Sequence, residues 1–326
     1  RYAKGQPVDW WGILLLAIGV GSLQTVLEKG ESEDWFATPY ISVLTVVTVL
    51  SAIAFIWREI STDHPVVNFR ILKYRSFSIG IFTSFALGFA LYGSMFIFPV
   101  FCQNLLGFSA QQTGELLFPG GLATICMMPF VGMMLKRGIP AQFMATLGFI
   151  MFFIFSLMLS NSNLESGTGD FFWPLIIRGL GMSVLFVPLT TLGIQDLHGK
   201  DIGQGTGLNN MMRQLGGSFG IAILTTMIHV NGGNNRNILL ENINGYNTSF
   251  IERKQAYIQG FQGRGFSAFD AEQMANRAME GVVTKQTMLV TYDNIYLLVG
   301  IFVLCCIPLV YLQKFKKNVP IPVDAH

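Results

Sequence analysis

Charged side chains are scarce in this chain. Lysine, arginine, aspartate and glutamate make up 12% of its 326 residues, against about 25% in an average soluble domain. Hydrophobic residues reach 51% and the formal net charge is only +2, so a basic surface suited to nucleic acid is not expected. The scarcity of charge over so long a chain predicts a protein that crosses a membrane several times.

Cysteine and histidine are also few. The four histidines show no paired spacing that would hold a metal, and the sequence has no GxSxG, P-loop or HExxH pattern. We therefore expect neither a cofactor nor an enzymatic activity, and keep a membrane enzyme as a minor alternative. Each of the four cysteines lies inside an apolar run and is expected to pack as a small hydrophobic residue: Cys102, Cys126, Cys305 and Cys306.

Eight segments are long and apolar enough to cross a bilayer, which takes roughly 20 residues. The fold class expected is therefore an all-α membrane protein with eight transmembrane helices. The chain starts with RYAKGQPVDW, which has neither an initiator methionine nor a signal-peptide pattern, and we expect it to be a piece of a longer protein. The predicted spans cover about residues 10–27, 39–57, 77–101, 112–135, 141–160, 171–195, 205–229 and 287–312.

The positions of lysine and arginine predict the orientation of these spans. The three short links on one side hold only Lys29. The opposite side, with both chain ends, is strongly basic and is therefore expected to be cytoplasmic. Its basic residues are Arg1, Lys4, Arg58, Arg70, Lys73, Arg75, Lys136, Arg137, Lys200, Lys314, Lys316 and Lys317.

The link before the last span, residues 231–285, is unusually long and contains two amphipathic segments, SFIERKQAYIQGF and SAFDAEQMANRAMEGV. The second begins with Ser267 and an aspartate three residues on, which resembles a capping box. We expect its apolar residues to share one helical stripe. The segment is predicted to be either a lid on the outer membrane face or a docking surface for a periplasmic partner. The stripe comprises Phe269, Met274, Ala278 and Val282.

One span carries a permanent charge, Arg213, in the run NNMMRQLGGSFG. A charge deep in a bilayer costs several kcal/mol and normally faces a bundle interior or a wet cavity. Arg213, with Asn210 and Gln214 beside it, either pins two helices together or lines a cavity or a gate. The following GGSFG would let a neighbouring helix approach closely.

Four further polar residues fall inside or near the ends of spans. Arg178 and Asp293 are expected at similar depth from the outer edge, and one alternative is that they pair, because a pair costs less than two isolated charges. Asp293 is thus a possible buried acid. Glu115 is either a helix N-terminal acid favoured by the dipole or a carboxylate facing an outward-open cavity, and Gln103 is a weaker cavity candidate.

Two spans contain proline and glycine, in the runs LFPGGLATICMMP and LFVPLTTLG. Such breaks are tolerated where neighbours or a cavity satisfy the freed backbone groups, and they can act as hinges. Both spans also carry methionine and phenylalanine, which either pack as an ordinary core or offer an adaptable surface to apolar molecules.

Four motifs together resemble the fourteen-span drug:proton antiporters of the major facilitator superfamily, and among these the EmrB/QacA type. They are VDWWGILLLAIGVGSLQTVLEKGESEDWF, GFSAQQTGELLFPGG, IRGLGMSVLFVPLTTLGI and GTGLNNMMRQLGGSFGIAI. The resemblance covers essentially the whole chain in order. In the last motif, Arg213, Gln214, Gly216, Gly217 and Gly220 match an RQLGGSIG-like run of that family.

The resemblance implies that the chain is the C-terminal half of a proton-driven multidrug efflux transporter of the bacterial inner membrane. Residues 1–75 would then form a two-helix insert with a cytoplasmic link, 76–230 the spans 3–7 of the C-terminal bundle, 231–285 a long periplasmic loop with amphipathic helices, and 286–326 the last span and a cytoplasmic tail. Spans 3, 4, 6 and 7 would face the central cavity. A self-contained channel or scaffold that dimerises is the alternative.

The resemblance also implies partners and shows two departures. The partners would be a six-span N-terminal half of the same transporter, small-molecule drugs and protons, and possibly a periplasmic membrane-fusion adaptor with an outer-membrane duct. Lys136 replaces the acid of the family's GxLxDRxG pattern, and Glu115 stands where an apolar residue is usual. The usual coupling carboxylate would lie in the N-terminal half.

Overall fold

The computed structural model describes residues 9–62, 66–67, 69–197, 199–242 and 248–313, which form helices and no strand. Four short 3-10 turns connect the longer helices: η1 (Glu31–Glu33), η2 (Trp35–Ala37), η3 (Phe69–Lys73) and η4 (Thr168–Phe171). The α-helices are α1 (Trp10–Lys29), α2 (Pro39–Ser61), α3 (Arg75–Asn104), α4 (Ala110–Lys136), α5 (Ala141–Leu159), α6 (Phe172–Ile194), α7 (Lys200–Asn242), α8 (Thr248–Gln262), α9 (Ala268–Cys305) and α10 (Ile307–Tyr311).

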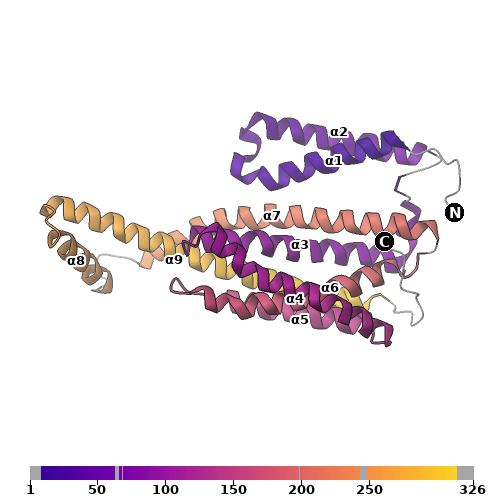
Figure 1. Cartoon of the computed structure of the whole chain (residues 1–326). Helices are drawn as coiled ribbons and strands as arrows, with labels where there is room; N and C mark the ends of the chain where they lie inside the picture. The colour runs from indigo at the N-terminus through magenta and orange to yellow at the C-terminus, as the bar shows by residue number, and fades with distance from the viewer. Residues whose placement is uncertain (1–8, 63–65, 68, 198, 243–247, 314–326) are drawn as a thin grey trace.

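The all-α membrane fold expected from the sequence is confirmed. Within the described residues, seven helical segments are long and apolar enough to cross a membrane, and they contain seven of the eight predicted spans. The remaining predicted span, 205–229, lies in α7, whose many glycine and asparagine residues lower its mean hydropathy. This helix nevertheless runs beside α3 along the bundle (Figure 1).

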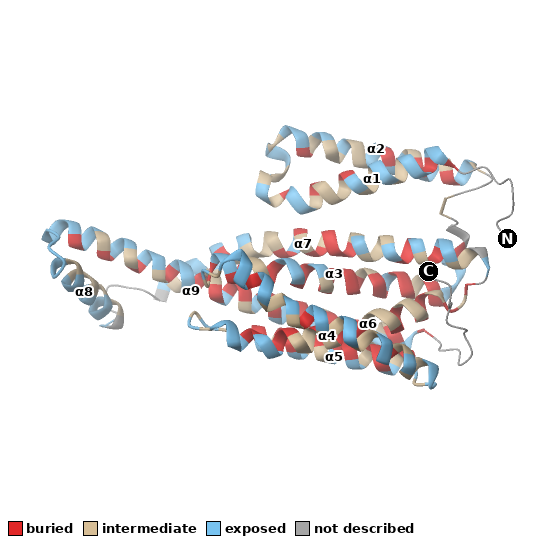
Figure 2. Ribbon diagram, viewed as in Figure 1, coloured by how far each residue is buried: buried red, intermediate tan, exposed pale blue. Residues whose placement is uncertain are grey.

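The bundle is built around α3, the most buried of the membrane-crossing helices (Figure 2). Its phenylalanines meet aromatic residues of α9 and of the turn before α6, with Phe101 packing edge-on against Tyr296 and Phe171. Phe152 and Phe155 of α5 extend the same core. Aromatic pairs in this geometry prefer fixed orientations, so α3, α5, α6 and α9 form one packed unit.

Glycines set the distance between α3 and α7. A Cβ at Gly88 would overlap the carbonyl oxygen of Arg213, and one at Gly216 would overlap the carbonyl oxygen of Phe85. Further along, a Cβ at Gly220 would lie 2.9 Å from the carbonyl oxygen of Phe89. Small residues allow helix backbones in membranes to approach this closely. The close approach predicted from GGSFG is therefore confirmed.

The segment predicted as a long loop, 231–285, is helical over most of its described length. The helix α7 continues to Asn242, and α9 begins at Ala268, so both extend beyond the bundle, where α8 packs back on α9 (Figure 1). Arg236 forms an ion pair with Glu280 between the two long helices. The polar residues that suggested a connecting loop instead lie on two helices, and polar side chains on the helix surfaces hold these helices together.

The predicted start of the second amphipathic segment is confirmed, because the Ser267 hydroxyl accepts a hydrogen bond from the backbone N–H of Asp270. The predicted stripe is wrong in part. Phe269 is 71% exposed, while Met274, Ala278 and Val282 are half-buried. The buried stripe recurs every four residues and lies one position further along: Ala271, Ala275, Met279 and Val283.

The two ends of the bundle differ in charge. The start of α1, the end of α2, the start of α3 and the end of α4 lie at one end, which we call the basic end because it carries Arg58, Lys73, Arg75, Lys136 and Arg137. The short turns at the opposite end, which we call the acidic end, carry Glu31, Glu33, Asp34, Glu165 and Asp170. This division follows the predicted orientation, with the basic end expected on the cytoplasmic side.

Candidate functional site

A cavity of about 330 Å³ lies between α3, α4 and α6. Its wall is almost entirely apolar, and the charged side chain in it is Arg178 of α6. These are three of the four helices that the resemblance implies would face a central cavity between two halves, which stays a prediction. Its apolar wall includes Leu91 and Met95 of α3, Leu117 and Ile125 of α4, and Met182 of α6.

The floor of this cavity is a very close contact between α4 and α6. A Cβ at Gly179 would overlap the carbonyl oxygen of Gly120, and a Cβ at Gly120 would lie 2.6 Å from the carbonyl oxygen of Leu175. The Thr124 hydroxyl bridges the helices by donating a hydrogen bond of 2.9 Å to the carbonyl oxygen of Gly179. Pro119 precedes this contact and has no N–H, which leaves one carbonyl of the preceding turn free. The LFPGG run thus lies at the cavity, and α4 continues through it as one helix.

This contact fixes the position of Arg178, because Arg178 directly precedes Gly179 in α6. Its guanidinium carbon lies 5.8 Å from the centre of the Phe155 ring, and its Nε is buried without a hydrogen-bond partner among the described residues. Cation–π attraction compensates the charge only in part.

The predicted alternative of an Arg178–Asp293 ion pair does not occur. The ion pairs described for residues 9–313 do not join these two side chains. Asp293 has one buried carboxylate oxygen, Oδ1, without a described hydrogen-bond partner. The buried Tyr296 hydroxyl also has no described hydrogen-bond partner. The Tyr296 ring instead packs on Phe155, 6.5 Å from ring centre to ring centre. An aromatic layer, not a salt bridge, lies next to the guanidinium.

Arg213 forms a second polar group with its predicted neighbours on one face of α7. Its Nη2 donates a hydrogen bond of 2.5 Å to Oδ1 of Asn210, and its guanidinium carbon lies 4.2 Å from the centre of the Phe186 ring of α6. Gln214 is exposed on the same face. Arg213 lies about 20 Å along the helix from Lys200, so the charge is deep in the bundle and links α7 to α6.

Gln103 and Glu115 do not line the cavity. Both are exposed near the acidic end, where α3 ends and α4 begins. Glu115 accepts a hydrogen bond of 2.9 Å from the side chain of Gln111 one turn earlier. The structure therefore separates these two candidates from Arg178 and from the Arg213 group.

The acidic end contains contacts that sequence reasoning missed. The Ser218 hydroxyl of α7 donates to Glu28 of α1 at 2.9 Å, and the Thr226 hydroxyl donates to Glu31 at 3.1 Å. Trp35 also donates its Nε1–H to Glu31 at 2.7 Å. The two carboxylates connect the α1–α2 hairpin to α7. The sequence signal was weak: Glu28 closes an apolar run but is separated from Ser218 by 190 positions.

Comparison with known proteins decides the family. The pattern of the Major Facilitator Superfamily matches residues 9–221, which is more than half of the chain. The chain belongs to the Major Facilitator Superfamily. This family consists of transporters, in agreement with the expectation that the chain is not an enzyme.

Several relatives in the superfamily are named for export or resistance. The chain is 29% identical over 312 residues to the multidrug export protein EmrB of Escherichia coli K12, covering 94% of the chain and 58% of the relative. It is 26% identical over 309 residues to the fatty acid resistance protein FarB of Neisseria gonorrhoeae, with 94% and 59% covered. It is 31% identical over 277 residues to EmrB of Haemophilus influenzae, with 83% and 54% covered. The chain thus spans somewhat more than half the length of these relatives.

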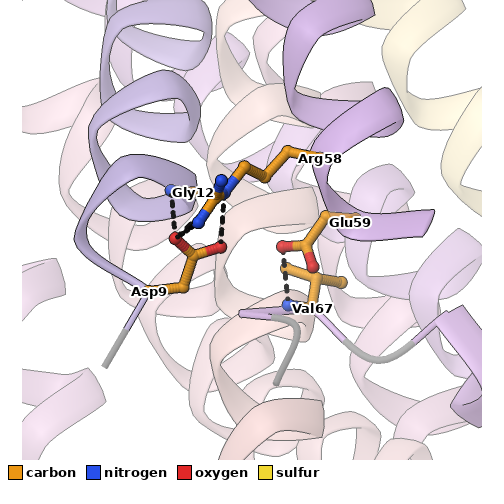
Figure 3. A network of polar contacts seen from close by, with 5 residues as sticks. All are labelled: Asp9, Gly12, Arg58, Glu59 and Val67. Carbon is orange, nitrogen blue, oxygen red and sulfur yellow. Dashed lines mark hydrogen bonds and ion pairs between the residues drawn. The ribbon is translucent and has the colours of Figure 1, made fainter. Parts of the chain in front are cut away.

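The Major Facilitator Superfamily match begins at Asp9, which organises the basic end of the α1–α2 hairpin (Figure 3). Its carboxylate accepts a hydrogen bond from the backbone N–H of Gly12 at 3.1 Å, and forms an ion pair of 2.9 Å with Arg58 of α2. Hydrogen bonding by the Arg58 side chain, and next that by Gly12, lowers the pKa of Asp9. The neighbouring Glu59 accepts a hydrogen bond of 3.0 Å from the backbone N–H of Val67. This bond holds the segment between α2 and α3 next to the Asp9–Arg58 pair.

Proposed function

We propose that the chain is the C-terminal half of a proton-driven multidrug efflux transporter that exports apolar or amphipathic small molecules. The observation that carries this proposal is the alignment of 94% of the chain with a relative named multidrug export protein. The cavity between α3, α4 and α6 supports it, because adaptable methionine and leucine side chains suit ligands of varied shape.

The other wall of the transport pathway would come from a six-span N-terminal half. Apolar side chains on the outward face of α4 are widely exposed, with Phe118 at 69% and Ile125 at 69%. This exposure fits a face that another half or lipid covers. In alternating access, two such halves rock about a site near the middle of the membrane, and protonation of a buried carboxylate biases which side is open.

We assign Arg213, Asn210 and Gln214 to the gate on the basic side of this pathway. The guanidinium is hydrogen-bonded along α7 and stacked on Phe186 of α6, so a shift of either helix changes its surroundings. Glu115, Gln103 and Asp293 are secondary candidates: the first two would face the pathway where it opens at the acidic end, and Asp293 would be a buried acid.

The proposal includes a location and partners. The basic end would face the cytoplasm of a bacterium, with the transporter in the inner membrane and both chain ends on the cytoplasmic side. The arm formed by α8 and the outer parts of α7 and α9 would then project into the periplasm. Its exposed apolar side chains, including Phe269, suit contact with a membrane-fusion adaptor that leads to an outer-membrane duct.

An efflux measurement tests the proposal. Cells without their own drug pumps would carry the full transporter that contains this chain, and drug accumulation would be followed before and after a protonophore. We expect protonophore-sensitive export, and a loss of about tenfold in rate for Arg213→Ala, equivalent to roughly 1.4 kcal/mol, at unchanged membrane expression. Accumulation equal to that in empty cells would refute the proposal. Normal export by the Arg213→Ala variant would refute only the assignment of Arg213 to the gate.

A further inference from the structure

The α3–α4–α6 cavity contains a cation without a matching anion. Arg178 lines the cavity, its Nε is buried and unpartnered among the described residues, and the described ion pairs do not include it. The hydroxyl of Thr124, which also lines the cavity, directs its single proton at the backbone carbonyl oxygens of Gly120 and Gly179, each 2.9 Å away.

An isolated buried charge is costly unless an opposite charge or hydrogen-bond acceptors approach it. The planar guanidinium matches a carboxylate especially well, because two parallel N–H donors can bind its two oxygens. Phe155 beside the guanidinium and Tyr296 packed on Phe155 offer ring faces and a hydroxyl but no carboxylate. Asp293 forms no described ion pair with Arg178. Electrostatics therefore favours an anionic group entering the cavity.

The rest of the cavity determines what else such a ligand carries. Leu91, Met95, Leu117, Ile125 and Met182 provide an apolar wall, and the volume of about 330 Å³ lies within the range of small-molecule sites. Gly121 and Ile125 are on the exposed face of α4, so the cavity opens on that side. A ligand whose carboxylate contacts Arg178 would place its apolar chain along this wall.

We propose that this cavity binds anionic amphipathic molecules, with the carboxylate of the ligand hydrogen-bonded to Arg178 and its apolar chain between α3 and α4. The inference deepens the proposed efflux function, because it names a substrate class and the residue that selects it. Neutral amphipathic molecules of the same length bind less tightly, since they leave the guanidinium uncompensated.

Direct binding tests this selection apart from transport. The purified full transporter in detergent would be titrated calorimetrically with decanoate and with decanamide, which share a chain length and differ in charge. We expect wild type to prefer decanoate, and Arg178→Gln to lose about tenfold or more in decanoate affinity while its decanamide affinity stays constant. Arg178→Lys keeps the charge without the planar pair of donors and should retain part of the preference.

Arg137→Gln is the matched control. Arg137 also lines an apolar pocket, at the end of α4 with Met127 and Phe130, but it is exposed, and its removal should leave both affinities unchanged. Equal losses for decanoate and decanamide in Arg178→Gln would show that the arginine only holds the bundle. Equal binding of both probes to wild type would overturn the inference. Arg178-dependent decanoate binding without export in cells would instead contradict the efflux function and leave the site intact.

Discussion

Three arginines in or beside the membrane-crossing helices are compensated in different ways. Arg58 meets the carboxylate of Asp9, and Arg213 has an amide and an aromatic ring. Arg178 has an aromatic ring and no ion pair among the described residues. A full ion pair holds a charge where the protein needs a fixed contact, and an incomplete set of partners leaves a charge available to a ligand. The three arginines therefore differ in how completely the surrounding protein compensates their charge.

The Asp9–Arg58 pair should stabilise the hairpin in a pH-dependent manner. Because the pKa of Asp9 is lowered in the folded protein, its stabilisation is present above the unfolded value of about 3.9 and is lost as the pH falls through the folded pKa. Asp9→Asn keeps an oxygen for the N–H of Gly12 but removes the charge. Thermal unfolding in detergent at pH 7 should show a lower Tm for the Asp9→Asn variant than for wild type.

This difference in Tm should shrink as the pH falls below about 4, because the unfolded state then takes up a proton, and it should vanish once the pH has passed through the lowered pKa of Asp9 in the folded wild type. Asp34→Asn is the control, because Asp34 is exposed in a left-handed turn conformation that asparagine tolerates, and it should match wild type at both pH values. A Tm difference for Asp9→Asn that is equal at pH 7 and pH 3 would argue against the charge as the cause.

At the scale of the elements, the contact between α3 and α7 depends on glycine. Gly88→Ala would place a methyl group against the carbonyl oxygen of Arg213, and overpacking of this kind typically destabilises by about 1–3 kcal/mol. We expect a clear fall in the Tm of the purified protein, and a similar fall for Gly216→Ala. Thermal unfolding followed by circular dichroism would measure both.

Gly233→Ala is the matched control for this prediction. Gly233 is also in α7, and a Cβ there would meet nothing within 4 Å. Alanine is the better helix former by roughly 0.5–1 kcal/mol, so Gly233→Ala should leave the Tm unchanged or raise it slightly. If Gly88→Ala behaved in the same way, the helices would have room to separate and the glycine contact would not set their spacing.

At the scale of the whole molecule, the α1–α2 hairpin is attached to the bundle through carboxylates of the acidic end. Glu31→Ala and Thr226→Val each remove one side of the same hydrogen bond. A double-mutant cycle, with unfolding free energies measured in denaturant, should give a coupling of about 1 kcal/mol. Glu165→Ala, an exposed acid at the same end, should show no coupling to Thr226→Val. Additivity of Glu31→Ala and Thr226→Val within about 0.3 kcal/mol would show that the hairpin does not depend on this contact.

The sequence predicts the helices well because membrane spans carry their own signal. Apolar runs gave the first six spans within a few residues of the helices observed, whereas α9 begins 19 residues before the predicted start of the last span. Ser267 marked a true helix start. The polar segment after residue 230 was wrongly predicted to be a loop. A helix satisfies its backbone hydrogen bonds internally, so α7 can continue through asparagine-rich sequence. The predicted stripe missed the buried one by two residues at Phe269 and by one residue at Met274, Ala278 and Val282.

Contacts between helices were the least predictable part of the site. The polar character of Arg178, Asp293 and Arg213 was visible from their apolar surroundings, but whether two of them pair depends on which helices are neighbours. A lone sequence contains no information on adjacency of this kind, and the same reason hid the contact between Glu28 and Ser218. Glycine spacing was the exception, since Gly216 and Gly220 indicate a close partner wherever it lies in the chain.

The uninterrupted course of α7 from the bundle to its outer tip has a mechanical consequence. The helix is 43 residues long, or about 65 Å, and its inner part lies against α3 while its outer part is tied to α9. A stiff rod of this length acts as a lever: a slight tilt within the lipid moves the far tip through a larger arc. The helix contains no described break between its two ends, so such a tilt would reach the tip without a separate hinge.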